Sequence, residues 1–332
     1  MTGPGMIDIV VGLAVLVAAA VALSVRDRLT SVVTFILLGG LLAVLWTAVR
    51  APDVALAEAA IGTGVTGALL VDAVADRRST RASSGRGRGR LLAWAAAALG
   101  GAGLVVVLVS AVLAADDTGG GVPLTGAVDE AMGSAAVGHE ITAVLLDFRA
   151  YDTLLEVAVI LVAVVGAYAL ASAIPSGANS ALSAASAVAE APTSPQPPAQ
   201  TLVDFLRMAA PVLLLLAAWL LFAGAYEPGG AFQGGAMLAG TAILAAGAGA
   251  APALLDGFSG RATVSIGPLA FLAAGGAGAL FAGHWLHMPP GLEAPATVAV
   301  EAALAVSIGA GLATLFLTVR RRPRQIVGGD RS

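Results

Sequence analysis

Apolar residues fill nine long stretches of the chain, and polar residues gather in the short segments between them. Each stretch is long enough to cross a bilayer core of ~30 Å as a helix that rises ~1.5 Å per residue. The pattern therefore predicts an all-α membrane protein with about nine transmembrane helices. The predicted spans are residues 6–25, 30–49, 54–75, 91–114, 153–174, 202–224, 232–253, 264–284 and 297–319.

Composition agrees with this prediction. Of the 332 residues, 58% are hydrophobic and 11% are charged, whereas a soluble domain carries about 25% charged residues. The chain has no cysteine, which excludes disulfides, thiolate zinc sites and cysteine-ligated iron–sulfur clusters. We expect no cofactor, and any redox chemistry would have to come from another chain.

The basic residues predict the orientation. All 17 are arginines, because lysine is absent. Fifteen of them fall in segments that share one side of the membrane if the N-terminus is outside and the C-terminus is cytoplasmic. Since positive charge favours the cytoplasmic side, we predict this orientation. The segments are residues 26–29, 76–90, 175–207, 254–263 and 320–332.

Two polar stretches divide the chain into modules. Residues 175–200 are rich in Ser, Ala and Pro, as in a flexible linker, and residues 76–90 alternate Ser, Gly and Arg. RNA binding by the Gly/Arg loop is a weaker interpretation than anchoring beside anionic lipid, so we expect no nucleic acid partner. The predicted parts are 1–75 with three spans, 91–174 with two, the linker, 201–320 with four, and a basic cytoplasmic tail at 321–332.

The external segment 116–150 begins with acidic residues and turns apolar from Ile141 to Phe148. This change predicts a short amphipathic helix on the membrane surface before the fifth span.

Carboxylates at the ends of apolar stretches are the candidate functional groups. An ionisable group at membrane depth costs about 2.5–3.5 kcal/mol on insertion scales, so a chain that keeps several moves ions or pairs them. At ~100° per residue, Glu58 and Asp72 share one stripe of the third span. Asp152 and Glu156 are i, i+4 neighbours. The candidates for an ion path are Asp53, Glu58, Asp72, Asp147, Arg149, Asp152, Glu156 and Glu301.

Solvation at the membrane interface is the alternative for these groups. It is credible for Asp53, Asp72 and Asp147. It is weaker for Glu58, Glu156 and Glu301, which uninterrupted apolar sequence follows. For those three the sequence favours an ion path or a buried pair.

Three further motifs indicate structure rather than binding. Gly62 to Gly67 match G-x-G-x-x-G but lie inside a span, without the strand that a dinucleotide site needs. His284 and His287 lie beside Trp285 without further metal ligands, as in an interfacial belt. A turn with small residues for helix packing explains Pro228, Gly229, Gly230, Phe232, Gln233, Gly234 and Gly235. A path lined by backbone carbonyls is the alternative for that turn.

Three parts of the chain resemble one family. Residues 30–75, with Ala51 to Glu58 and Gly62-Thr63-Gly64, resemble the MbhD-like domain of Mrp-type Na⁺/H⁺ antiporters and ion-pumping membrane-bound hydrogenases. Residues 139–171, with Leu146 to Glu156, resemble the MbhE-like domain that follows MbhD at the end of the large Mrp subunit. Residues 205–320, with Pro228 to Gly235, resemble the MnhB domain of the Mrp B subunit. The chain departs from these patterns at Leu155, Ala225 and Ala231, where Gly, His and Gly are usual.

The resemblance implies a subunit of a multi-subunit cation/proton antiporter in the bacterial plasma membrane, with no enzyme activity. Its partners would be a separate chain carrying the large antiporter-like domain, the small Mrp subunits C to G, and membrane lipid. Glu58 and Glu156 would titrate, with Asp53, Asp147 and Asp152 at the mouth and Arg149 fixing their geometry. Two alternatives stay open, which are a subunit of a redox-driven ion pump and a structural scaffold without ion-path residues.

Overall fold

The computed structural model describes residues 5–77, 124–173, 200–250, 257–286 and 291–320, with 99, 103, 106, 107, 109, 110 and 255 as single residues. The predicted span 91–114 and linker 175–200 lie almost wholly outside this part, and the predicted tail 321–332 lies outside it. The ordered elements within it are helices, so the predicted all-α class is confirmed, whereas the count of nine spans and the orientation of the termini stay predictions.

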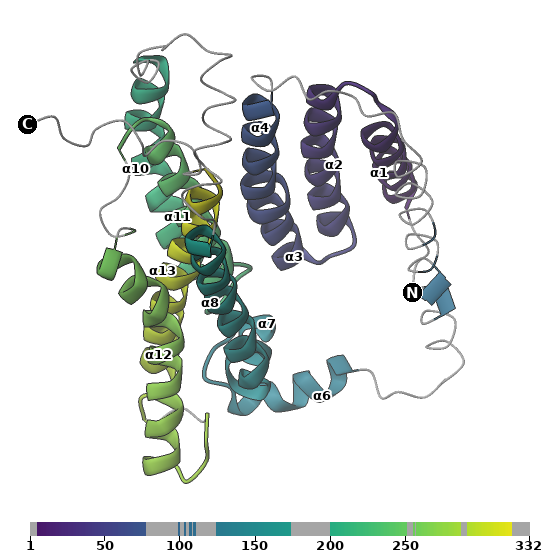
Figure 1. Cartoon of the computed structure of the whole chain (residues 1–332). Helices are drawn as coiled ribbons and strands as arrows, with labels where there is room; N and C mark the ends of the chain where they lie inside the picture. Colours follow the sequence, from purple (N-terminus) through teal and green to yellow (C-terminus); the bar gives the residue numbers. More distant parts are fainter. Residues whose placement is uncertain are drawn as a thin grey trace, which may run out of the picture. The chain divides into compact units, whose positions relative to one another are not determined.

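The described helices follow the apolar stretches closely (Figure 1). They are α1 (Met6–Ser24), α2 (Arg28–Ala48), α3 (Pro52–Ala57), η1 (Glu58–Val65), α4 (Thr66–Arg77), α6 (Leu124–Ala131), η2 (Met132–Ser134), α7 (Glu140–Ala143), η3 (Val144–Phe148), α8 (Ala150–Ala173), α10 (Gln200–Ala223), α11 (Ala231–Gly247), α12 (Gly257–Phe281) and α13 (Glu293–Arg320).

Within the described residues, seven helices are long and apolar enough to cross a membrane. The chain is therefore a multi-pass membrane protein. Helix α11 is an eighth apolar helix but has only 17 residues, whereas the sequence predicted a span to residue 253. The predicted end was wrong because the backbone leaves the helix at Ala248 and Gly249 takes φ 81°, a left-handed conformation that glycine adopts at little cost.

Local sequence explains where several helices begin. Asp27 caps α2 by accepting a 2.8 Å hydrogen bond from the Thr30 N–H, one of the donors that a helix start leaves unpaired. Pro52 starts α3, where its fixed φ suits the first helical position. Arg50, with φ 63°, turns the chain between α2 and α3.

The chain divides into two compact units, residues Met1–Asp72 with Ala135–Ser332, and residues Ala73–Ser134. In the first unit α13 is the central helix. In the most apolar 18-residue stretch of α13, 72% of the residues are buried inside the chain. The corresponding share is 11–33% in the other six candidate spans. Figure 1 shows α8, α11 and α12 gathered beside it.

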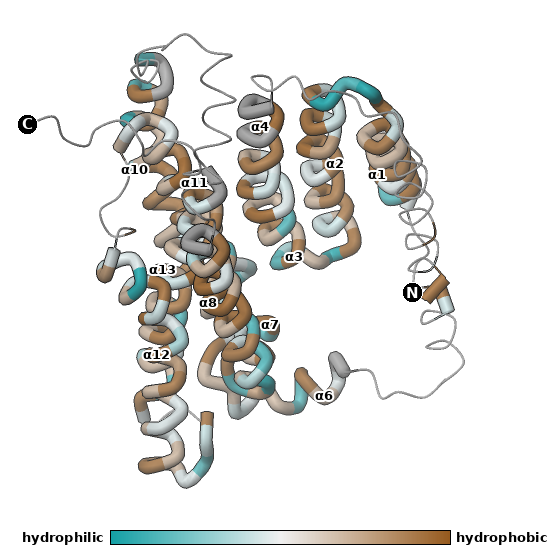
Figure 2. The backbone as a smooth tube through the Cα atoms, viewed as in Figure 1, coloured by the Kyte–Doolittle hydropathy of each residue, from teal (hydrophilic) through white to brown (hydrophobic). Residues whose placement is uncertain are grey.

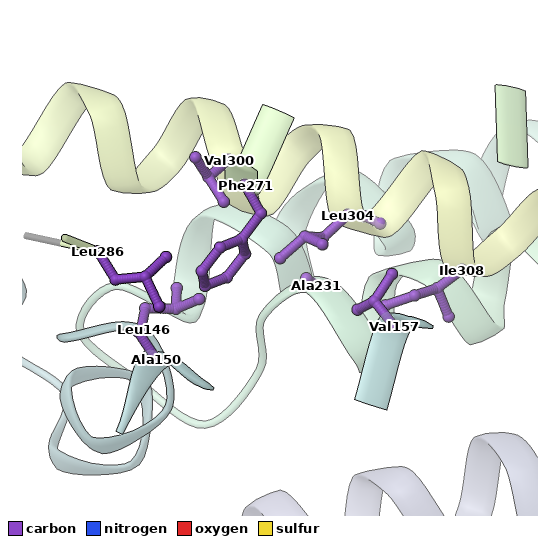
Figure 3. Close-up of a cluster of buried hydrophobic side chains, with 10 residues drawn as sticks. Leu146, Ala150, Val157, Ala231, Phe271, Leu286, Val300, Leu304 and Ile308 are labelled. Atoms are coloured by element: carbon purple, nitrogen blue, oxygen red, sulfur yellow. The ribbon is translucent and has the colours of Figure 1, made fainter. Parts of the chain in front are cut away.

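Two apolar clusters hold α13 in place. The first joins Phe271 of α12 and Leu146 to Val300, Leu304 and Ile308 of α13 (Figure 3). The second joins Val65 and Val164 to Phe316. At one crossing α11 and α13 approach so closely that a Cβ on Gly235 would lie 2.9 Å from the Ala305 carbonyl oxygen. Such small-residue contacts are how helices associate within a membrane.

Most residues of the other spans are apolar (Figure 2), and many of their large apolar side chains are exposed. On α1, for example, Val10, Leu13 and Leu16 are exposed by 57–66%. Apolar side chains on this scale face lipid or other membrane helices rather than water.

Residues 140–148, where the sequence predicted a short amphipathic helix, form α7 and η3. Thr142, Ala143 and Leu146 are at most 4% exposed, whereas Ile141 is 45% exposed. Leu146 packs in the cluster around Phe271. One side of this segment is therefore buried against the chain, and its place on the membrane surface stays a prediction.

Two helical segments are π-helical, η1 from Glu58 to Val65 and η3 from Val144 to Phe148. Each contains a carboxylate that the sequence singled out, Glu58 or Asp147. A π turn holds more residues than an α turn. The stripe predicted from Glu58 to Asp72 assumed α geometry throughout, and η1 interrupts it.

Candidate functional site

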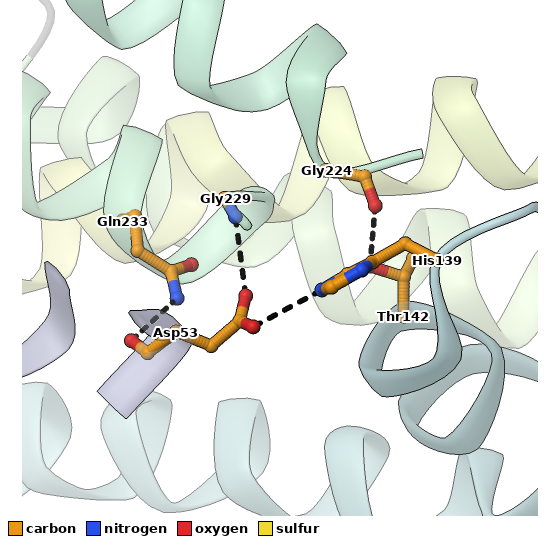
Figure 4. Close-up of polar contacts among 6 residues, drawn as sticks. All are labelled: Asp53, His139, Thr142, Gly224, Gly229 and Gln233. Carbon is orange, nitrogen blue, oxygen red and sulfur yellow. Dashed lines mark hydrogen bonds and ion pairs between the residues drawn. The ribbon is translucent and has the colours of Figure 1, made fainter. Parts of the chain in front are cut away.

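Asp53, in the first turn of α3, is held by groups from distant parts of the chain (Figure 4). Its Oδ1 accepts a 3.1 Å hydrogen bond from the Gly229 N–H. Its Oδ2 lies 3.1 Å from His139 Nε2. The Gln233 side chain donates to the Asp53 carbonyl oxygen at 3.3 Å. Solvation at the membrane interface was the alternative that the sequence left open for Asp53, whereas this side chain is only 13% exposed.

His139 is the residue that the sequence reasoning missed. It lies immediately before α7, and its ring is 16% exposed. Its partner is 86 residues earlier in the chain, so no local motif marks the pair. One signal was available, because the predicted topology places His139, before the fifth span, on the same side of the membrane as Asp53, which opens the third.

The backbone fixes this segment against the end of α10. The N–H groups of Gly138 and His139 donate to the Ala225 carbonyl oxygen at 2.9 and 3.0 Å. The Thr142 hydroxyl donates to the Gly224 carbonyl oxygen (Figure 4). These bonds occupy backbone carbonyls of the turn that follows α10 and set the position of His139.

Glu301 is the deeply buried carboxylate of the site. It lies in the central helix α13 and is 3% exposed. The backbone N–H of Ala231, the first residue of α11, donates to it. Its second oxygen, Oε2, has no hydrogen-bond partner. A buried charged oxygen without a partner is costly, which distinguishes this carboxylate from the paired Asp53.

The turn from Pro228 to Gly235 serves both carboxylates. Gly229 donates to Asp53 and Ala231 donates to Glu301. Between them Gly230 has φ 107°, and a Cβ there would lie 3.0 Å from Glu301 Oε1. Of the other singled-out residues, Phe232 packs against the cluster around Phe271, and Gly234 and Gly235 bring α11 close to α10 and α13.

The Glu58 side chain lies apart from these groups, where η1 faces α2. A Cβ on Gly62 would lie 2.7 Å from the Glu58 carboxyl carbon, and one on Gly39 of α2 would lie 3.3 Å from Oε1. The Thr63 hydroxyl also faces Gly39 and has no hydrogen-bond partner. Asp72 lies in α4, but its side chain is outside the described part.

The carboxylates near the start of the fifth span, Asp147, Asp152 and Glu156, do not join this site. Asp147 accepts a 3.4 Å hydrogen bond from the Ala136 N–H. Arg149 and Asp152 form a 2.8 Å ion pair with side chains 69% and 42% exposed. Glu156 is exposed on α8. It therefore points away from the interior of this chain, unlike Glu301.

The histidines at the end of α12 form no metal centre that the structure shows. His284 is exposed beside Trp285, and His287 lies outside the described residues. No group of three His, Cys, Asp or Glu residues suited to a metal occurs within the part of the chain that the structure describes.

Two family models match the chain. Residues 13–78 match MbhD, described as the D subunit of MBH, and residues 201–319 match a domain related to the MnhB subunit of a Na⁺/H⁺ antiporter. The chain joins an MbhD domain to an MnhB-related domain. The resemblance to Mrp-type antiporter subunits is thereby confirmed for these two parts. The MbhE-like assignment of residues 139–171 stays a prediction.

One solved structure has a fold similar to that of this chain. A chain of the Mrp complex from Dietzia sp. DQ12-45-1b is similar with a TM-score of 0.69 and 24% identity. The match covers 95% of this chain and 35% of that one. This MbhD–MnhB chain thus spans about a third of the length of the chain it matches. No curated protein matches it.

Proposed function

We propose that the chain is one component of a multi-subunit Mrp-type antiporter that exchanges Na⁺ for protons across a bacterial plasma membrane. It acts as part of a secondary transporter and not as an enzyme. Its partners are a separate large antiporter-like chain and small Mrp subunits. The MbhD and MnhB matches and the likeness to an Mrp complex support this assignment.

The observation that carries the proposal is Glu301. A carboxylate that is 3% exposed, with one oxygen free of partners, lies in the central span. Structural burial of a charge normally requires pairing, and Oε2 is not paired. Ionisable groups kept at membrane depth mark ion pathways. Glu301 would therefore take up a proton or Na⁺ during exchange.

The other two candidate ion carriers, Glu58 and Glu156, have different surroundings. Glu58 would carry an ion between η1 and α2, where Gly62 and Gly39 leave room for its carboxylate. Glu156 is exposed on an otherwise apolar part of α8, beside Leu155 and Val159. Facing lipid there would cost several kcal/mol, so Glu156 would face a polar group of a neighbouring subunit.

The test uses the assembled complex in inside-out vesicles of a host that lacks its own Na⁺/H⁺ antiporters. A pH-sensitive dye reports proton movement when NaCl is added. Glu301→Gln keeps the side-chain shape and removes the charge. We expect normal assembly and exchange reduced at least ~10-fold, because a positioned proton-transfer group typically contributes ~10²–10⁴-fold to a rate. Glu130→Gln, an exposed carboxylate outside the spans, is the matched control.

Full exchange by an assembled Glu301→Gln complex would contradict the proposal that Glu301 carries the ion. It would favour the scaffold alternative if Glu58→Gln were also fully active. A redox-driven pump is the second candidate, because the MbhD model is described as part of MBH. Exchange driven by a Na⁺ pulse without any electron donor would exclude that candidate.

A further inference from the structure

The His139 ring is not needed to hold its own segment in place. The N–H groups of Gly138 and His139 and the Thr142 hydroxyl attach the segment to the Ala225 and Gly224 carbonyls. Two of these donors are backbone groups, and the third belongs to another residue. The imidazole itself is directed at Asp53, with Nε2 3.1 Å from Oδ2 (Figure 4). The ring is therefore positioned by the backbone and is free for chemistry at Asp53.

Asp53 and His139 are poorly exposed, at 13% and 16%. An exposed ion pair contributes ~0–1 kcal/mol to stability and needs no function. This pair differs because Gly229 also holds Asp53 at Oδ1, which leaves Oδ2 to the imidazole. One aspartate oxygen thus faces a fixed donor and the other faces a group that can gain or lose a proton.

The same turn connects the pair to the buried carboxylate. Gly229 donates to Asp53, and two residues later Ala231 donates to Glu301. Gly230 lies between them, close to Glu301 Oε1. The pair and the buried carboxylate therefore contact backbone groups that are two residues apart in one turn.

We infer that His139 is a proton-carrying residue of this transporter, which exchanges a proton with Asp53 at the start of the third span. The inference rests on the proposed function and adds a residue to it. In the transfer the His139 Nε2–H bond breaks and an Asp53 Oδ2–H bond forms. An imidazolium–carboxylate pair becomes a neutral pair, and the net charge does not change.

Few other titratable groups approach this pair. Glu140 follows His139 in the chain, and the turn after α10 contributes Tyr226, whose ring lies against Gly138, and the exposed Glu227. Asp147 of η3 is bonded to Ala136, three residues before His139. Asp53 of α3 is the acidic group within ion-pair distance of the ring in the described part of the chain.

The test compares His139→Gln with wild type in the complete complex. Glutamine places an N–H donor near the position of Nε2 but cannot carry a proton. We expect normal assembly on a native gel, Na⁺/H⁺ exchange lowered at least ~10-fold, and a changed dependence of the remaining rate on pH. The apparent Km for Na⁺ should change less than the maximal rate. His284→Gln, the same substitution at an exposed histidine, is the matched control and should behave as wild type.

Three outcomes would overturn the inference. His139→Gln could retain full exchange with an unchanged pH profile. It could rescue the exchange that His139→Ala loses, which would show that the ring only donates a hydrogen bond. It could also prevent assembly, which would make the role structural. Absence of exchange in the wild-type complex itself would instead contradict the proposed function.

Discussion

Asp53 and Glu301 lie on different helices, α3 and α13, yet both accept hydrogen bonds from one turn, Asp53 from the Gly229 N–H and Glu301 from the Ala231 N–H. The two carboxylates belong to the first and last parts of the chain. The turn between α10 and α11 therefore links the MbhD domain to the centre of the MnhB-related domain.

Asp53→Ala should destabilise the protein. It removes the acceptor for Gly229 and the partner of His139, and a buried donor left unpaired costs about 1–3 kcal/mol. We expect a clear drop in the unfolding temperature of the purified complex. Asp204→Ala removes an exposed ion pair with Arg207 and should change stability by no more than ~0.5 kcal/mol. Equal effects of the two substitutions would show that the Asp53 contacts contribute little.

Gly230→Ala should destabilise the protein more than the addition of one methyl group normally does. The backbone there has φ 107°, and the added Cβ would lie 3.0 Å from Glu301 Oε1. An alanine in such a conformation costs about 1–3 kcal/mol. Gly240→Ala, in the helix that follows with nothing within 4 Å of the new Cβ, should be neutral or stabilising. Thermal unfolding of both variants measures the difference, and a Gly230→Ala protein as stable as Gly240→Ala would contradict it.

Gly62→Ala should displace the Glu58 carboxylate, because the new Cβ would lie 2.7 Å from its carboxyl carbon. The glutamate side chain can rotate away, so we expect assembly to survive and Na⁺/H⁺ exchange to fall several-fold. Gly40→Ala on α2 meets nothing within 4 Å and serves as the control in the same vesicle assay. Unchanged exchange in Gly62→Ala would mean that the position of Glu58 is not critical.

Arg149→Ala should leave stability nearly unchanged. Its ion pair with Asp152 is 2.8 Å long, but the two side chains are 69% and 42% exposed, and exposed pairs contribute ~0–1 kcal/mol. We expect the unfolding temperature of the isolated chain to shift by no more than a few degrees, with Arg207→Ala as the comparison. A larger loss within the assembled complex than in the isolated chain would place Arg149 at a boundary between subunits.

Apolar length alone predicted the seven described helices that are long enough to cross a membrane, and the shorter α11 without its end, because a bilayer requires a continuous apolar helix. The same signal could not separate Glu301 from Glu156. Both precede long apolar sequence, yet one is buried and the other exposed, since side chains facing lipid or a partner are as apolar as those in the core.

The rest of the site was beyond local patterns. The π turns at Glu58 and Asp147 were missed because an α-helical period was assumed. His139 was missed because its partner is distant in sequence. Turn residues such as Gly229 showed a tight turn but not which carboxylates its N–H groups would meet.

The separation between Asp53 and Gly229, 176 residues, has a consequence for biogenesis. The ribosome delivers Asp53 long before the turn that will hold it, and domains form in the order of synthesis. During that interval Asp53 must stay hydrated, which its place at the beginning of a span allows at the edge of the bilayer. Glu301 emerges last, when the Ala231 N–H already exists. The carboxylate that has to wait opens a predicted span, and the one that enters the interior comes after its donor.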